Sequence, residues 1–186
     1  PVPLTATIAP PPGFAVFFFP AGDKPNMAHM FNVGVQRQLP WSSVLDVNLD
    51  GAWRVAQAVA RRLKDADRAG SIVNIASVLA ERVAAQVAPY TVSKAALVQL
   101  TKAMALELPR HRSRVNALAP GYVETPINRD FFATEGGQAL VRRIPQRRLG
   151  RVEDLEAPLV LLASDASAYM TGAVIAVDGG HAISSL

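Results

Sequence analysis

Apolar positions change their spacing several times along the chain. They recur at helical spacing from Trp41 to Leu63 and again from about Tyr90 to Leu108. Shorter helical patterns cover Phe131 to Arg143 and Val152 to Ala163. The pattern therefore predicts four helices after residue 40.

Three continuous apolar runs lie between these helical segments and read as buried strands. They are Ser71 to Ala76, Arg114 to Ala119 and Ala173 to Val177. Strands that are apolar on both faces and alternate with helices are typical of a parallel sheet covered by helices on both sides. We therefore expect residues 41–186 to form one α/β domain.

The first 40 residues differ from the rest of the chain. Seven of the fourteen prolines lie before residue 26, and no long periodic segment is present. Gly13 to Phe19 is predicted to form one buried strand and Met30 to Val35 another short one. We interpret residues 1–40 as a divergent, irregular, Pro-rich segment.

Composition narrows the possible chemistry. Half of the residues are hydrophobic and 18% are charged, which is typical of a globular protein. The chain has no cysteine, so disulfides, thiolate catalysis and sulfur-ligated metals are excluded. The three histidines are far apart in the sequence, and we expect no metal site.

The net charge is +4, and arginines form two clusters. Their members are Arg110, Arg112 and Arg114 in the first, and Arg142, Arg143, Arg147, Arg148 and Arg151 in the second. No stacking aromatics are interleaved with them, so solvated surface or contact with a cofactor phosphate or substrate anion is favoured over nucleic acid. The apolar run from Phe14 to Phe19 is too short to span a bilayer and no basic residue precedes it, so we expect no membrane association and a cytoplasmic protein.

The segment Tyr90-Thr91-Val92-Ser93-Lys94 is the first sign of catalytic chemistry. Residues four apart on a helix lie on the same face, one turn apart. A phenol has a pKa of about 10, and a cation within about 4–6 Å can lower such a value by roughly 1–3. Tyr90 would then be a usable acid/base near neutral pH. By itself the spacing equally describes a helix start with a half-buried tyrosine and a surface lysine.

Three further polar residues stand at positions that suit a ligand site. Ser77 directly follows a predicted strand, at the edge of a parallel sheet where ligand-binding groups emerge. Asn48 lies inside the first long helix, although asparagine is a poor helix former. Thr125 follows the Pro120-Gly121 turn that ends another strand. An ordinary turn serine, a surface asparagine and a plain loop exit are the alternatives.

Taken together, these motifs resemble the short-chain dehydrogenase/reductase family. The matching segments, in order, are Asp46-Val47-Asn48-Leu49-Asp50-Gly51, Ser77 after Ile-Val-Asn-Ile-Ala, Tyr90 and Lys94 in YxxSK, Asn116 to Thr125, and the tail ending Val177-Asp178-Gly179-Gly180. The resemblance covers about residues 41–186. It implies a Rossmann-like, doubly wound parallel sheet in three layers, and an NAD(P)-dependent oxidoreductase that interconverts a secondary alcohol and a ketone.

The resemblance also implies roles for individual residues. Tyr90 would be the general acid/base, Lys94 would lower its pKa and bind the nicotinamide ribose, and Ser77 would orient the substrate oxygen. Asn48 would hold a water in a proton relay that passes Lys94. The cofactor, NAD or NADP, would contact Tyr90, Lys94, Pro120, Gly121, Val123 and Thr125.

The resemblance gives only the general class of the substrate and of the partners. The substrate would be a small alcohol or ketone contacting Ser77, with Leu79 and Gln86 as further candidates. The stretch from Ile127 to Pro145 matches the family's variable substrate lid, with Phe131 and Phe132 as candidate apolar contacts. In relatives the two long helices form a dimer or tetramer interface, so a homo-dimer or homo-tetramer is expected.

The chain departs from the family pattern at its start. The family opens with a Thr-Gly-x-x-x-Gly-x-Gly loop that approaches the cofactor pyrophosphate. Before Asn48 this chain has only Gly13, Gly22 and Gly34, nine and twelve residues apart. We therefore expect the amino-terminal cofactor-binding half to be missing or divergent and the sheet to be truncated on that side. The alternative function is a catalytically silent fragment that acts only through association of its helices.

Overall fold

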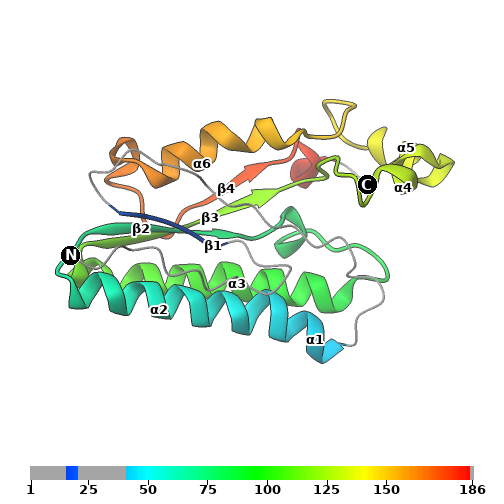
Figure 1. The fold of residues 1–186 in the computed structure, drawn as a ribbon. Coiled ribbons are helices and arrows are strands. Elements are labelled where there is room, and N and C mark those ends of the chain that lie inside the picture. Colours follow the sequence, from blue (N-terminus) through cyan, green and yellow to red (C-terminus); the bar gives the residue numbers. More distant parts are fainter. Residues whose placement is uncertain (1–15, 21–40, 185–186) are drawn as a thin grey trace.

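The computed structural model describes residues 16–20 and 41–184. They form a four-stranded sheet between two layers of helices, with α1, α2 and α3 on one face and α6 on the other (Figure 1). The strands are β1 (Val16–Pro20), β2 (Gly70–Ile75), β3 (Ser113–Pro120) and β4 (Val174–Val177), in the order β1-β2-β3-β4. This confirms the Rossmann-like, three-layer α/β architecture.

One edge of the sheet differs from the expected all-parallel arrangement. β2, β3 and β4 are parallel to one another, but β1 pairs with β2 in the antiparallel direction, from Val16 opposite Asn74 to Pro20 opposite Gly70. An apolar run predicts a strand but does not encode its direction. β1 therefore occupies the edge of the sheet beside β2. The predicted strand at Met30 to Val35 lies outside the described residues.

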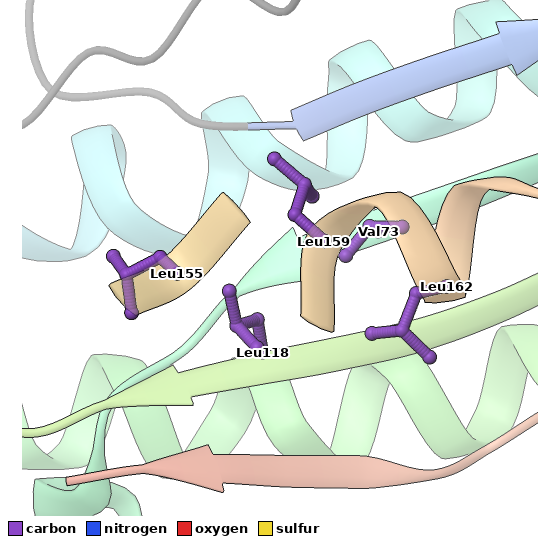
Figure 2. Close-up of a cluster of buried hydrophobic side chains, with 5 residues drawn as sticks. All are labelled: Val73, Leu118, Leu155, Leu159 and Leu162. Carbon is purple, nitrogen blue, oxygen red and sulfur yellow. The ribbon is translucent and has the colours of Figure 1, made fainter. Parts of the chain in front are cut away.

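The two faces of the sheet bury separate apolar clusters because successive strand residues point to opposite sides. On β2, Ile72 belongs to the cluster with Ala56 of α2 (Ala52–Asp65) and Met104 of α3 (Ala88–Glu107). Its neighbour Val73 belongs to the cluster on the α6 side (Figure 2). The members of that second cluster are Val73, Leu118, Leu155, Leu159 and Leu162.

The first predicted helix is interrupted by a wider turn. α1 (Trp41–Leu45) runs into a π-helical segment, Asp46–Gly51, and then into α2. Such π-bulges accommodate an extra residue in a helix and are frequent at functional sites. Asn48, expected to be unusual inside a helix, is the buried residue of this segment.

The prediction of one helix from Phe131 to Arg143 was wrong. The structure has two short helices, α4 (Arg129–Ala133) and α5 (Glu135–Val141), which meet at Thr134. Thr134 is extended, and its hydroxyl accepts a hydrogen bond from Gly137 N at 3.1 Å, so a side-chain cap starts a new helix. Similarly, α6 begins at Glu156, after a 3₁₀ turn, Val152–Leu155.

Several arginines of the two clusters form hydrogen bonds or ion pairs with other residues of the chain. The Arg114 guanidinium donates to the carbonyls of Leu162 and Ser164 at 3.2 and 3.0 Å, at the carboxyl end of α6. Arg112 pairs with Asp67 at 2.5 Å, and Arg148 with Asp154 at 2.6 Å. Within the described residues no helix combines the length and the apolar character needed to cross a membrane.

Candidate active site

The four predicted catalytic residues lie near the end of β2. Ser77 follows β2 directly and begins the 3₁₀ turn Val78–Ala80. Tyr90 and Lys94 lie in the first turns of α3, which starts at Ala88 with a proline in its first turn, where proline is favoured. Asn48 reaches α3 from the π-helical segment.

Lys94 is a buried cation with few partners among the described residues. Its exposed fraction is 8%, and its Nζ donates one hydrogen bond, to Ile75 O at 2.8 Å. Nζ also lies 5.7 Å from the centroid of the Tyr90 ring. Because charge is disfavoured in this buried position, the pKa of Lys94 falls to about 8. An ammonium group has three donors, so two of them have no partner in the described part of the chain and can serve a ligand.

The electrostatics of Tyr90 differ from the expectation that Lys94 lowers its pKa. Burial raises the pKa of Tyr90, a side-chain hydrogen bond with Ser77 opposes this rise, and the neighbouring Tyr122 adds to it. Lys94 directs a hydrogen bond at a main-chain carbonyl and lies beside the phenol ring. Desolvation is therefore the dominant influence on the pKa of Tyr90.

Ser77 and Asn48 are held by specific contacts. Ser77 is buried, and its hydroxyl oxygen accepts a hydrogen bond from Leu79 N at 3.1 Å. Asn48 Nδ2 donates to Ser93 Oγ at 3.0 Å, and Ser93 Oγ donates to Tyr90 O at 2.7 Å. The asparagine thus fixes the start of α3, the turn that carries Tyr90.

The Pro-Gly turn lies at the end of β3, against the end of β4. Gly121 N donates to Val177 O at 3.0 Å, and a Cβ on Gly121 would stand 2.7 Å from Asp178 Cα. Only glycine fits such a close approach. Beyond it, Asn128 orders the loop, since its Nδ2 donates to Val123 O and its Oδ1 accepts from Thr125 N, both at 2.8 Å.

The two further substrate candidates lie in different settings. Leu79 is buried and contributes its amide to the Ser77 hydroxyl, whereas Gln86 is exposed in a left-handed conformation with φ of 66°. Contact of either residue with substrate stays a prediction.

Sequence reasoning missed four residues near the site. Tyr122 influences Tyr90, and its ring lies 5.2 Å from that of His181. Asp178 and Arg82 hold the turn that carries His181. The Asp-Gly-Gly sequence indicates a turn there, but no local pattern pairs Arg82 with it, because the two segments are about a hundred residues apart.

The nicotinamide end of a dinucleotide fits the residues present. Lys94, Tyr90 and the turn from Pro120 to Thr125 lie at adjacent strand ends. Within the described residues the buried Lys94 ammonium keeps donors for hydroxyl groups, and the turn offers main-chain groups for an amide. No glycine-rich phosphate loop occurs in the described residues. No group of His, Asp and Glu in the described part of the chain is placed to bind a metal ion.

Comparison with known proteins defines the class. Residues 27–182 match the family model described as enoyl-(acyl carrier protein) reductase. The gluconate 5-dehydrogenase of Gluconobacter oxydans (strain 621H) is 40% identical over 162 residues, which are 82% of this chain and 63% of that protein. The chain belongs to the short-chain dehydrogenase/reductase family.

Solved structures agree in fold and sequence. The gluconate 5-dehydrogenase from Burkholderia cenocepacia J2315, in complex with NADP and tartrate, matches with a TM-score of 0.77 and 38% identity, over 83% of this chain and 64% of that one. A short-chain type dehydrogenase/reductase from Mycobacterium marinum matches with a TM-score of 0.71 and 39% identity, over 83% and 62%. This chain therefore spans somewhat less than two thirds of the length of these relatives.

Proposed function

We propose that this chain carries the catalytic half of an NAD(P)-dependent oxidoreductase that interconverts a secondary alcohol and a ketone. One observation supports it most: Ser77, Tyr90 and Lys94 meet at the carboxyl end of β2, with Asn48 bonded to the same helix turn. NAD or NADP supplies or accepts the hydride when bound. The relatives' names suggest a sugar acid as substrate, D-gluconate being the first to assay.

Each residue has a defined task in this proposal. In the oxidative direction Tyr90, as phenolate, accepts the proton of the substrate hydroxyl, and in the reductive direction its phenol donates a proton to the carbonyl oxygen. Ser77 donates a hydrogen bond to that same oxygen and orients it. Lys94 binds the ribose hydroxyls of the nicotinamide nucleoside through its remaining donors, and Pro120, Gly121, Val123 and Thr125 form the wall beside the carboxamide.

Because burial raises the pKa of Tyr90, Lys94 helps to form the Tyr90 phenolate only while the lysine itself is protonated. A protonated Lys94 stabilises the phenolate, and with a pKa of about 8 the lysine remains mostly protonated at neutral pH. Asn48 orders the main chain that carries Tyr90 and, in this proposal, holds a water that passes protons to Lys94.

A second function is favoured by a different observation. Apolar side chains remain exposed on α1, α2 and α3, including Trp41 at 52%, Trp53 at 37% and Val92 at 47%. Since the glycine spacing of the phosphate loop is absent before Asn48, the chain could act through helix association alone. Homo-dimers or homo-tetramers would bury these side chains in either case.

Titration with NADH and NADPH, followed by nicotinamide fluorescence, tests the proposal. Saturable binding in the micromolar range, together with oxidation of D-gluconate that Tyr90→Phe abolishes, is the expected result. No binding of either nucleotide up to millimolar concentration contradicts the enzymatic function and leaves the association function. Sedimentation at several protein concentrations measures that association directly.

A further inference from the structure

The last described residues form a compact turn, Asp178 to Ser184, which we name the C-terminal turn. Its Gly179 and Gly180 have φ of 63° and 87°, a conformation that favours glycine. The Asp178 carboxylate closes the turn on itself by accepting from Gly180 N at 2.8 Å and from Ala182 N at 2.6 Å. The turn is therefore an ordered structure.

The C-terminal turn meets two of the loops that carry the candidate active site. Gly179 O accepts from Gln146 N at 3.1 Å, just beyond the predicted substrate lid. The His181 ring lies edge-on to Tyr122, which follows the Pro-Gly turn, with ring centroids 5.2 Å apart. His181 is 4% exposed, so its ring is enclosed by these neighbours.

Arg82 connects the turn to a third loop, the one that begins with Ser77. Its guanidinium donates to the carbonyl oxygens of His181 and Ser184, the latter at 3.0 Å, and to Ser184 Oγ at 2.9 Å. Arg82 N itself donates to Val78 O at 2.9 Å, next to Ser77. Hydrogen bonds from a charged donor are about twice as strong as neutral ones, so one side chain joins two loops firmly.

Aromatic contacts extend from the C-terminal turn to α4 through Tyr122. Tyr122 packs against His181 on one side and against Phe132 of α4 on another, with centroids 5.8 Å apart. Tyr122 is also close enough to Tyr90 to influence its ionisation. Moving His181 would therefore move the Tyr122 ring, which packs against Phe132 of α4.

We propose that Arg82 is a positioning residue that holds the C-terminal turn against the Ser77 loop, so that His181 and Tyr122 form the wall of the substrate site beside Tyr90. This inference rests on the proposed function. The described side-chain hydrogen bonds of Arg82 all go to the turn. Loss of Arg82 therefore weakens substrate binding, while the residues that take part in hydride and proton transfer stay in place. Lys94 and Thr125, which the proposed function assigns to the nucleotide, direct their own hydrogen bonds to Ile75 O and Asn128 Oδ1 and not to the turn.

Two measurements on purified full-length protein test this: amide hydrogen exchange, and steady-state oxidation of D-gluconate with NAD⁺ and NADP⁺. The variants are Arg82→Gln, which removes the charge, and Arg82→Lys, which keeps a cationic donor. Arg112→Gln is the matched control, because its arginine forms an exposed ion pair with Asp67 at the other end of the strands. Thermal unfolding of every variant is recorded.

In Arg82→Gln we expect KM for D-gluconate to rise about tenfold or more while kcat changes little, as for lost charged hydrogen bonds that act on binding. Exchange should accelerate in residues 179–184 and in the peptide that contains Tyr122. Arg82→Lys should recover part of both effects, and KM for the nucleotide should rise less than KM for D-gluconate. Arg112→Gln should behave as the wild type.

Unchanged exchange in residues 179–184 of Arg82→Gln would overturn the proposal, and so would faster exchange with an unchanged KM. Faster exchange throughout the protein, with a parallel fall of Tm and loss of nucleotide binding, would also overturn it by making Arg82 a general structural residue. A wild type without turnover contradicts the proposed function itself. Exchange then decides separately whether Arg82 holds the turn.

Discussion

The two ends of the parallel strands both carry basic side chains but use them differently. At the amino ends of β2 and β3 a cavity of about 530 Å³ is lined by residues that include Ser71, Arg112 and Arg114. There the guanidinium of Arg114 is bonded to main-chain carbonyls and that of Arg112 to Asp67. At the carboxyl end, Lys94 is buried with a single carbonyl partner in the described part.

This difference indicates where chemistry can occur. A charge whose donors are satisfied by its own chain stabilises the fold and has little left for a ligand. A buried charge with spare donors, beside a phenol whose pKa is shifted, is typical of a functional site. This cavity is thus at the structural end of the sheet, and the proposed reaction takes place at the other. Four substitutions test this division.

The largest effect is expected for Tyr90→Phe, which removes the acid/base group. Turnover should fall about 10²–10⁴-fold, the range for loss of general acid/base catalysis, with little change of stability. Steady-state assays of D-gluconate oxidation measure it. Tyr169→Phe is the control, because Tyr169 is fully exposed beside the amino-end cavity. Equal losses in the two variants would remove the distinction between the two ends.

Lys94→Met should reveal the energetic cost of the buried cation. The folded pKa of about 8 lies below the unfolded value of 10.5, so folding disfavours the protonated lysine. The free energy of unfolding of the wild type should therefore rise between about pH 8 and 10.5, by roughly 3 kcal/mol in total, while Lys94→Met should lack this rise. Urea unfolding of both proteins across that pH range measures the difference.

If the free energy of unfolding of the wild type does not rise relative to that of Lys94→Met over this pH range, the lowered pKa of the buried lysine is contradicted. A shared rise in both proteins would come from other groups and is subtracted by the comparison. Turnover by Lys94→Met should be strongly reduced at every pH in this range.

Arg114→Gln tests the structural end. Its bonds to the carbonyls at the end of α6 are charge-assisted, so unfolding free energy should fall by about 2 kcal/mol. The kcat/KM of the folded protein should remain that of the wild type. Urea unfolding and steady-state kinetics are measured together, and a large loss of kcat/KM with normal stability would place chemistry at this end as well.

The smallest effect is expected for Arg112→Gln. The Arg112–Asp67 pair is exposed, and such pairs contribute about 0–1 kcal/mol. The change of unfolding free energy should disappear in high salt, because exposed charges are screened. A loss as large as that of Arg114→Gln would show that exposure does not separate the two arginines.

The sequence predicted the local elements best where the periodicity was long. α3 and the three parallel strands lie within one or two residues of their predicted bounds. The prediction of one helix in the lid was wrong because a threonine such as Thr134 can also continue a helix. In the structure the extended backbone of Thr134 ends α4, and Gly137 packs closely on Phe131 as α5 begins. The π-helical turn at Asn48 likewise depends on its bond to Ser93 in another helix.

Motif spacing by itself determined the family and the four residues proposed to act: Asn48, Ser77, Tyr90 and Lys94. Side-chain periodicity is a local property and motif order is a property of the linear chain, so the sequence alone contains both. Tertiary structure alone decided the antiparallel pairing of β1, the direction of the Tyr90 pKa shift, and the joining of Arg82 to the C-terminal turn. These depend on desolvation and on contacts between segments far apart in the chain, which no local pattern encodes.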